Sequence, residues 1–288
     1  GGRPEVLYER PVAGYPCRMP SVAIHTVGAG GGSVAWIDGG GSLRVGPRSS
    51  GAVPGPAAYG HGGTEPAVTD ANVALGRINP TGTLAGTLPI RADLAVAALD
   101  SVGERLGLTT AATAHGIVTV VEEVMAGAIR TVSIEQGADP REGHLVAFGG
   151  AGGLHATALA RRLGMAGVIV PPYSGVFSAL GLLLSPPRAD AALSVRLDEG
   201  GRLDAEIASV VATAEDRLRA GGSAADSTLA FVDVRYRGQS HETTVPYEVG
   251  AGWSVLLERF HRTHHERNGF ARVDDPVEVV TVRAESVG

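Results

Sequence analysis

Apolar residues recur along the chain with two different periods, and each period predicts a different kind of element. In the first quarter apolar and polar positions alternate, which is typical of strands. Short strands are expected at 6–8, 21–27, 33–37 and 43–45. Further along, apolar residues recur every three or four positions, which predicts helices at 91–106 and 110–136. The second helix carries the clearest stripe and is expected to be well buried. That stripe consists of Ile117, Val120, Val121, Val124, Ala128, Ile129 and Val132.

A strand, a turn, a helix and a second strand follow one another later in the chain. The run HLVAF at 144–148 is apolar throughout, which is typical of a strand buried on both faces. A helix is expected at 154–163 and the second strand at 168–170. Such a unit pairs its strands in parallel through a right-handed crossover. Beyond it, Ser174 is expected to cap a helix that ends near Ser185.

The pattern changes after Pro186 and Pro187. Alternating strands are expected at 231–236, 242–249 and 277–283, and helical stripes at 203–218 and 253–264. This mixture is typical of a small α+β domain. We therefore predict two domains, an α/β domain at 1–187 and a smaller α+β domain at 188–288.

One segment, residues 46–63, is too rich in glycine and proline to form a helix or a central strand. Its low charge favours an ordered loop, and ordered loops of this length are usually functional. Directly after it, Thr69 or Asp70 is expected to cap a helix that runs through Arg77.

Composition narrows the class of protein. Glycine, at 42 of 288 residues, is about twice as frequent as usual. A net charge of −6 and the lack of any Lys/Arg run argue against a nucleic-acid-binding surface. Cys17 is the one cysteine, so an internal disulfide is excluded and a reducing compartment is favoured. No apolar run reaches the ~18 residues that a membrane span needs. A cytoplasmic protein with no membrane partner is predicted, and a homo-oligomer is left open.

Two glycine runs, GAGGGS at 28–33 and FGGAGGLHA at 148–156, raise the question of a phosphate site. Neither is followed by the lysine of a P-loop, and neither completes the dinucleotide fingerprint G-x-G-x-x-G. The second run nevertheless joins the end of a strand to the start of a helix. Free amides and a partial positive charge there suit an anion or a nucleotide. The same glycines also suit a close strand–helix crossing, and the residues alone do not decide between the two.

Other candidate residues are less specific. Asp70 and Asn72, beside the long loop, are read either as parts of a helix cap or as groups that hold Mg²⁺ or a substrate. His261 and His265 are four residues apart on a predicted helix, where a solvated face is favoured over a metal site. HETTV at 241–245 lacks the second histidine of a zinc-protease motif. Ser33 lies in no nucleophile-elbow motif.

Six motifs occur in an order that resembles the hydantoinase A/5-oxoprolinase family. They are GAGGGS (28–33), VGPRSSGAVPGPAAYG-x-GG (45–63), P-x-VTDANVALGR (66–77), FGGAGGLHA (148–156), SGVFSALGLL (174–183) and RYRGQS (235–240). The family includes ATP-dependent oxoprolinases, N-methylhydantoinases and the ATP-using subunits of acetone and acetophenone carboxylases. Two positions depart from its usual pattern, which has proline in place of Gly153 and asparagine near Glu122 and Glu123. The second departure is expected to affect substrate choice if that position faces the substrate.

The resemblance implies an actin-like (ribonuclease H-like) ATPase fold of class α/β, in which two related halves close on ATP·Mg²⁺. The phosphate loops of that fold, D-x-G-G-T-x-x-D, do not occur in this sequence and are expected before Gly1. The chain is thus expected to be the C-terminal portion of a longer protein. The implied adenosine-binding residues are Gly149, Gly150, Ala151, Gly152, Gly153 and His155; the last lies near the ribose or phosphates, or packs the turn.

For catalysis, the resemblance points to Asp70 and Asn72 in the cleft, with Asp70 as a Mg²⁺ ligand. Ser33 is added because it is expected at the carboxyl end of a central strand, where open α/β sheets bind ligands. The glycines of 28–33 are expected to let the backbone pass close to a substrate or to the loop at 46–63.

The implied function is ATP-dependent hydrolysis of a cyclic amide, whose oxygen is phosphorylated before the ring opens. A hydantoinase B-type subunit is the expected partner, and the chain by itself is expected to be inactive. Two alternatives stay open: the ATP-using subunit of an acetone-type carboxylase, and a catalytically silent interaction module.

Overall fold

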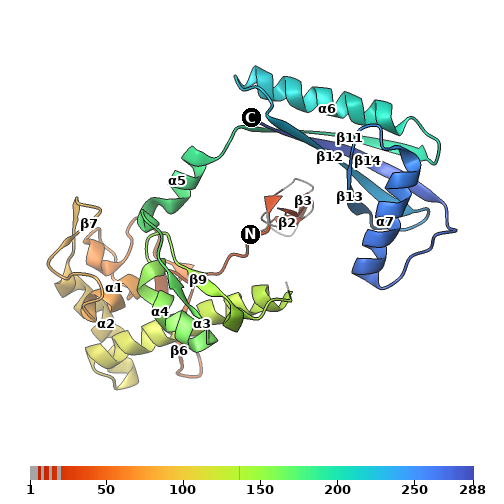
Figure 1. Cartoon of the computed structure of the whole chain (residues 1–288). Coiled ribbons are helices and arrows are strands. Elements are labelled where there is room, and N and C mark those ends of the chain that lie inside the picture. The colour runs from red at the N-terminus through yellow and green to blue at the C-terminus, as the bar shows by residue number, and fades with distance from the viewer. Residues whose placement is uncertain (1–5, 8–9, 13–14, 18–20, 136) are drawn as a thin grey trace. The chain divides into compact units, whose positions relative to one another are not determined.

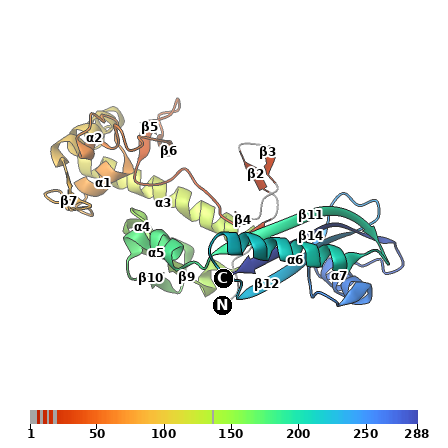
Figure 2. The same cartoon turned by 90° about the horizontal axis from the view of Figure 1, so that it is seen from above.

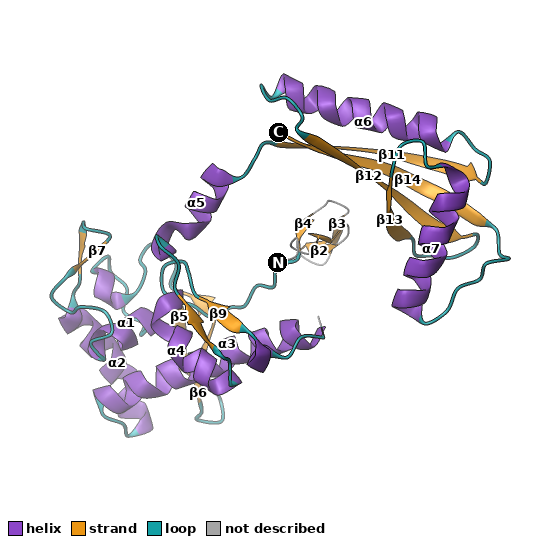
Figure 3. Cartoon of the chain, viewed as in Figure 1, coloured by secondary structure: helices purple, strands orange, loops and turns teal. Residues whose placement is uncertain are grey.

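The computed structural model describes residues 6–7, 10–12, 15–17, 21–135 and 137–288. Contacts divide the chain into two compact units, Gly1–Gly181 and Leu182–Gly288, and each is described by itself. The helix α5, Phe177–Leu184, spans this division, so the predicted domain limits of 1–187 and 188–288 stay a prediction. Within the described residues, no helix combines the length and apolar character needed to cross a membrane. Figure 3 shows that helices dominate the first unit and long strands the second.

The first unit is built on three helices and a hairpin (Figure 1). The helices are α1 (Val68–Ala74), α2 (Ala92–Leu106) and α3 (Thr110–Glu135), and the antiparallel hairpin is β5 (Ser33–Ile37) with β6 (Leu43–Ser49). Their apolar faces form one core, because residues of all five elements belong to the same buried cluster. The predicted helices at 91–106 and 110–136 are confirmed, except that residue 136 lies outside the described residues. Within α3 the predicted stripe is partly wrong, since Val124 is 38% exposed and Val118 is buried instead.

A second group of elements completes this unit. The strands β9 (His144–Val146) and β10 (Gly167–Ile169) pair in parallel on either side of α4 (Gly152–Leu163), which confirms the predicted strand–helix–strand unit. Burial of the first strand on both faces is wrong. The described sheet has only these two strands, and Val146 and Ile169 are 46% and 49% exposed. The 3-10 helix η3 (Ser174–Val176) follows and leads into α5, so Ser174 begins a helical turn that Tyr173 precedes as cap.

Short elements fill the remainder of the first unit. They are β1 (Val6–Leu7) with β4 (Ser21–Val22), β2 (Arg10–Val12) with β3 (Tyr15–Cys17), β7 (Thr83–Leu84) with β8 (Leu88–Pro89), and the 3-10 helices η1 (Ala57–Tyr59) and η2 (Pro140–Glu142). The predicted strand at 21–27 is wrong beyond residue 22, and residue 8 of the predicted strand 6–8 lies outside the described residues. The helix expected to start at Thr69 or Asp70 begins earlier, at Val68.

The second unit is an antiparallel sheet with two helices (Figure 2). Its strand order is β11–β14–β12–β13, with bounds Arg188–Asp198, Val277–Val287, Ser227–Tyr236 and Thr243–Tyr247. The helices α6 (Leu203–Ala220) and α7 (Gly252–Asn268) share one buried cluster with the sheet, so both pack on the same face. The predicted α+β composition is confirmed. The strand β11 has no counterpart among the predicted elements, although its apolar residues alternate with polar ones along almost its whole length, as in Leu193, Val195 and Leu197.

Candidate functional site

Three stretches that are distant in the sequence meet around Gly31. Its carbonyl oxygen accepts hydrogen bonds from the Thr69 amide at 2.8 Å and from the Thr69 hydroxyl at 3.0 Å. A Cβ atom added to Gly31 would lie 2.9 Å from that hydroxyl and 3.5 Å from Cβ of Ala151. The segments GAGGGS, VTDAN and GGAGG therefore converge at one point of the first unit, where a larger residue than glycine would push them apart.

The loop at 46–63 lies directly against the first of these segments. The Ser50 amide donates to the carbonyl oxygen of Gly32 at 2.8 Å, and the Trp36 indole N–H donates to the carbonyl oxygen of Gly46 at 2.9 Å. Gly46 has a positive φ of 74°, and a Cβ atom there would collide with the carbonyl oxygen of Gly28. The glycines of 28–33 were expected to let the backbone pass close to a substrate or to the facing loop. In the structure the facing loop, residues 46–63, lies against them.

Ser33 closes the turn of its own segment. Its hydroxyl accepts from the Gly30 amide at 2.9 Å and donates to the carbonyl oxygen of Gly28 at 3.4 Å, and the residue is buried. Ser33 begins β5, so its expected place at the carboxyl end of a central strand is wrong. A catalytic role for Ser33 stays a prediction, and the geometry offers a structural one.

Asp70 anchors the long loop. One carboxylate oxygen accepts from the amides of Ala67 at 2.7 Å and Ala57 at 3.3 Å, and the other accepts from the Ala58 amide at 2.7 Å. The residue has no exposed surface, and its burial raises the pKa of the carboxyl group, although the three amides act in the opposite direction. The arrangement ties the 3-10 helix η1 to the start of α1.

Asn72 follows Asp70 by two residues on α1 and is also buried. Its side-chain nitrogen donates to the carbonyl oxygen of Val68 at 3.0 Å, while its side-chain oxygen has no hydrogen-bond partner among the described residues. No group of three or more His, Cys, Asp or Glu residues among those described is arranged to hold a metal ion. A Mg²⁺ site at Asp70 therefore stays a prediction, which its three amide partners do not favour.

The turn GGAGG at 149–153 presents an open face at the start of α4. Gly149 has a positive φ of 90°, which favours glycine, and its amide donates to the carbonyl oxygen of Ser174 at 2.7 Å. No atom of the described part of the chain lies within 4 Å of the position that a Cβ atom would take at Gly149, Gly150, Gly152 or Gly153. Since the first amides of a helix lack partners within it, this face suits a flat ring or an anion.

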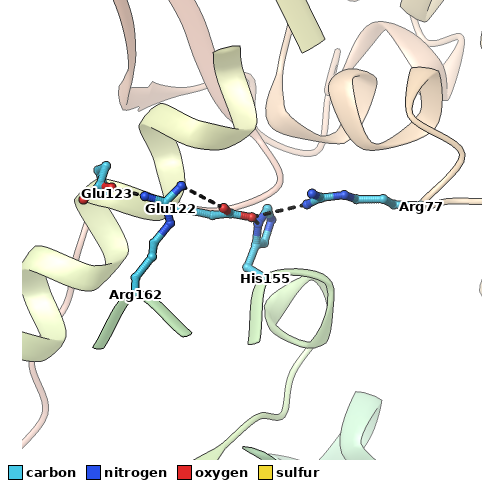
Figure 4. A network of polar contacts seen from close by, with 5 residues as sticks. All are labelled: Arg77, Glu122, Glu123, His155 and Arg162. Atoms are coloured by element: carbon cyan, nitrogen blue, oxygen red, sulfur yellow. Dashed lines mark hydrogen bonds and ion pairs between the residues drawn. The ribbon is translucent and has the colours of Figure 1, made fainter. Parts of the chain in front are cut away.

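A polar network centred on a buried carboxylate links α3 to the same helix (Figure 4). Glu122 of α3 is 4% exposed, and one of its carboxylate oxygens lies 3.3 Å from both His155 Nδ1 and Arg77 Nη1. Its other oxygen lies 3.5 Å from Arg162 Nη2, and Arg162 also pairs with the exposed Glu123. We call Glu122, His155, Arg77 and Arg162 the Glu122 cluster.

His155 was expected either near the nucleotide or packing the turn, and the geometry favours packing. The residue is fully buried, and its Nε2 atom has no hydrogen-bond partner among the described residues. The sequence marks Glu122 and Glu123 as a departure from the family pattern, but it does not predict the contacts that Glu122 makes with α4. Glu122 follows Val118 and Val121 on the buried face of α3, and a charge in the middle of an apolar stripe is the signal that marks it.

An apolar hollow of about 440 Å³ adjoins these elements. It lies between the segment that leads into GAGGGS, the face of α3 beyond Glu122, and Leu159 of α4. Its lining residues are His25, Val27, Ala29, Met125, Ala128, Ile129, Val132, Ser133 and Leu159. The hollow offers a surface for a hydrocarbon group close to the convergence of the three motifs.

Two histidines of α7, His261 and His264, contribute to the core of the second unit, whereas His265 is exposed. Tyr236 Oη lies 2.8 Å from His261 Nδ1, and the two rings stack. His264 is buried, with Nδ1 2.8 Å from the carbonyl oxygen of Phe270. Burial, and to a lesser extent His264, lowers the pKa of His261. His261 is thus half-buried rather than part of the solvated face expected for it. The segment HETTV runs into β13, as its strand-like pattern predicts.

Comparison with known proteins shows which family the chain resembles. The family model described as hydantoinase/oxoprolinase matches residues 1–191. The caprolactamase subunit alpha of Pseudomonas jessenii is 35% identical over 301 residues, which cover 100% of this chain and 43% of that protein. The 5-oxoprolinase of Saccharomyces cerevisiae is 30% identical over 311 residues, which cover 100% of this chain and 24% of that protein. The chain thus spans less than half the length of these relatives.

Two solved structures share the fold. The crystal structure of the ATP-dependent caprolactamase from Pseudomonas jessenii matches with a TM-score of 0.71 and 34% identity, over 95% of this chain and 42% of that one. A nucleotide-free acetone carboxylase structure matches with a TM-score of 0.82 over 99% of this chain and 44% of that one. At 20% identity, the second match concerns the fold alone.

Proposed function

The chain belongs to the hydantoinase/oxoprolinase family, and from this premise we propose that it forms the adenosine-binding side of an ATP-dependent enzyme that opens cyclic amides. The family relatives that support this reaction class are a caprolactamase and a 5-oxoprolinase. We propose further that the fold is actin-like, with a second, related half in the part of the relatives' length that this chain does not cover.

The observation that carries the proposal is the open face of the GGAGG turn. Gly150, Gly152 and Gly153 leave room above the backbone at the start of α4, where amide hydrogens and the helix dipole attract a nucleotide. Gly149 turns the chain with its positive φ, and its bond to Ser174 holds the turn. Bound ATP would supply the phosphoryl group that turns the amide oxygen into part of a good leaving group. The chain's part is to bind and orient.

The substrate class is inferred from the apolar hollow that Leu159 of α4 helps to line. Its walls from α3 and α4 suit the methylene groups of a cyclic amide, because apolar surface is removed from water on both sides. Among the described residues, no group of three or more His, Cys, Asp or Glu side chains is arranged to hold a metal ion, and the Asp70 carboxylate accepts hydrogen bonds from three backbone amides. We therefore assign the Mg²⁺ and phosphate ligands to the part of the enzyme beyond this chain, and no catalytic step to Asp70. A hydantoinase B-type partner is proposed because one relative is named as a subunit.

A substitution at Gly150 tests the nucleotide assignment. Gly150→Val places a branched side chain in the open face, where nothing crowds it, so the variant is expected to fold. In the protein expressed from its complete coding sequence, ATP affinity measured by calorimetry should fall by at least about a hundredfold, since a bulky group at an adenine surface removes its contacts. Gly39→Val is the matched control, because Gly39 also faces open space, in the hairpin turn. Unchanged ATP affinity in Gly150→Val would refute the assignment.

The same protein distinguishes the alternatives. Phosphate release from ATP that rises with caprolactam, hydantoin or 5-oxoproline supports the proposed reaction. Release that requires bicarbonate and a ketone instead would favour the carboxylase alternative. A wild-type protein that binds no ATP would favour a silent interaction module.

A further inference from the structure

We propose that Glu122 is a positioning residue, which holds the first turn of α4 and thereby keeps the GGAGG turn in the shape that binds a nucleotide. The proposal rests on the function proposed above and assigns a role to a residue outside the family motifs.

The Glu122 cluster connects two of the three motif-bearing segments that meet at Gly31, those of α1 and α4, through α3. Arg77 lies just beyond α1, Glu122 lies on α3, and His155 and Arg162 lie on α4. Figure 4 shows the carboxylate of Glu122 between side chains that arrive from these elements. One carboxylate thus contacts both the first turn and the last turn of α4. Because α4 begins within the GGAGG turn, fixing the helix fixes the turn.

The contacts act mainly through charge. At 3.3–3.5 Å they are longer than ideal hydrogen bonds, but Glu122 is almost fully buried, where opposite charges attract more strongly than in water. Two guanidinium groups compensate its charge, and they are themselves 33% and 27% exposed, so water solvates their outer faces. A carboxylate at this depth is tolerated because these partners surround it.

Glu122 is also the one side chain that His155 contacts through a ring nitrogen among the described residues. Nδ1 faces the carboxylate, and Nε2 has no hydrogen-bond partner. Removing the carboxylate leaves a fully buried imidazole without a polar contact at either nitrogen, which is costly in an apolar interior. The first turn of α4 is then expected to shift until the ring finds water or another partner.

Burial separates this role from direct ligand binding. His155 has no exposed surface and Glu122 has almost none, so neither reaches a nucleotide on the open face. Their effect on binding is therefore transmitted through α4. The unusual acid at this position is then explained by its partners His155, Arg77 and Arg162 rather than by contact with a substrate.

Three variants of the protein expressed from its complete coding sequence test the proposal. Glu122→Ala removes the carboxylate, and Glu122→Gln keeps its shape and one oxygen acceptor. Glu123→Ala is the matched control, because Glu123 is exposed and pairs with Arg162 but does not contact His155. Hydrogen exchange of the amides at 149–156 reports on the turn without any ligand, and ATP titration reports on binding.

In Glu122→Ala, exchange at 149–156 should accelerate at least tenfold and the KM for ATP should rise about tenfold, the size expected for losing a buried charged contact. The kcat at saturating ATP should stay within about twofold, because no reacting group is removed. Glu122→Gln should give a smaller change in the same direction, and Glu123→Ala should match the wild type.

Two results would overturn the proposal. The first is that both Glu122→Ala and Glu122→Gln keep the wild-type rate of hydrogen exchange at 149–156 and the wild-type KM for ATP. The second is that hydrogen exchange accelerates equally in α2, α3 and α4. The second would mean that Glu122 supports only the general fold. If Glu122→Ala does not fold, the comparison of Glu122→Gln with Glu123→Ala decides. A wild-type protein that binds no ATP refutes the proposed function, while the exchange measurement still tests the positioning.

Discussion

Replacing Asp70 with alanine removes an acceptor that three backbone amides of the first unit share, those of Ala57, Ala58 and Ala67. The first two belong to the loop at 46–63, and the third lies just before α1. We expect Asp70→Ala to release this loop and to destabilise the first unit. If Asp70 is instead a Mg²⁺ ligand, its replacement should affect activity and leave the stability of the metal-free protein almost unchanged.

The magnitude follows from the number of contacts. A buried donor left unpaired costs about 1–3 kcal/mol, so three donors set an upper limit of roughly 9 kcal/mol. The loop can relax toward water, and the desolvation cost of the buried carboxylate disappears with the side chain. The free energy of unfolding should then fall by about 3 kcal/mol, which equals the upper end of the cost of one unpaired buried donor. Asparagine keeps one acceptor oxygen but turns an NH₂ group toward an amide donor, so Asp70→Asn should also be destabilising.

The loss should depend on pH in a defined direction. Burial raises the pKa of the Asp70 carboxyl group above its ordinary value, so the folded state favours the protonated form more than the unfolded state does. A raised pKa contributes stability that is present below the unfolded value and is lost as the pH rises through the folded value. The stability difference between wild type and Asp70→Ala should therefore widen as the pH falls from neutrality toward 4.

The assay uses the two tryptophans, one in each unit. In a Trp253→Phe background, Trp36 fluorescence reports on the first unit alone, and its indole contacts the start of the loop through Gly46. Unfolding in guanidinium should shift to a lower midpoint in Asp70→Ala. Glu65→Ala is the control, because its exposed ion pair with Arg48 should contribute less than about 1 kcal/mol. An unchanged midpoint in Asp70→Ala, or a wild-type midpoint that rises with added Mg²⁺, would refute the anchoring argument.

Two further predictions concern single contacts. Gly31→Ala should lower the stability of the first unit by about 1–2 kcal/mol, because its Cβ atom would lie 2.9 Å from the Thr69 hydroxyl. Adding Thr69→Ala should recover part of that loss in the same fluorescence assay, and strictly additive losses would contradict the close contact. Burial, together with a hydrogen bond to Asp204, raises the pKa of Tyr247 to about 12. The stabilising effect of the protonated Tyr247 hydroxyl should be present below pH 10 and vanish as the pH passes 12. Tyr247→Phe should remove the last step of an ultraviolet tyrosine titration, and an unchanged titration curve would refute the raised pKa.

Most elements follow from local pattern. The helices α2, α3, α4, α6 and α7 are found where apolar residues recur every three or four positions, because that spacing gives one buried stripe. The parallel pairing of β9 and β10 is likewise readable from the strand–helix–strand order. How deeply those strands are buried could not be predicted from the sequence pattern, because burial depends on which other elements cover them.

The candidate site shows the same division. The glycine-rich motifs mark their own positions, since glycine is needed where the chain turns sharply, as at Gly149. That Gly31, Thr69 and Ala151 meet is decided by packing across more than a hundred residues of chain, which no local period encodes. For the same reason Asp70 is readable as a helix-start residue, whereas its bonds to Ala57 and Ala58 are not.

Glu122 marks the limit of what pattern alone can say. A charged residue on an apolar stripe predicts a polar or oppositely charged partner, because burying an isolated carboxylate costs too much free energy. Which partners it has depends on how α3, α4 and the end of α1 come together, and only the tertiary structure brings His155, Arg77 and Arg162 around it. Periodicity is a property of neighbours three or four residues apart, while charge compensation is a property of side chains that folding makes adjacent.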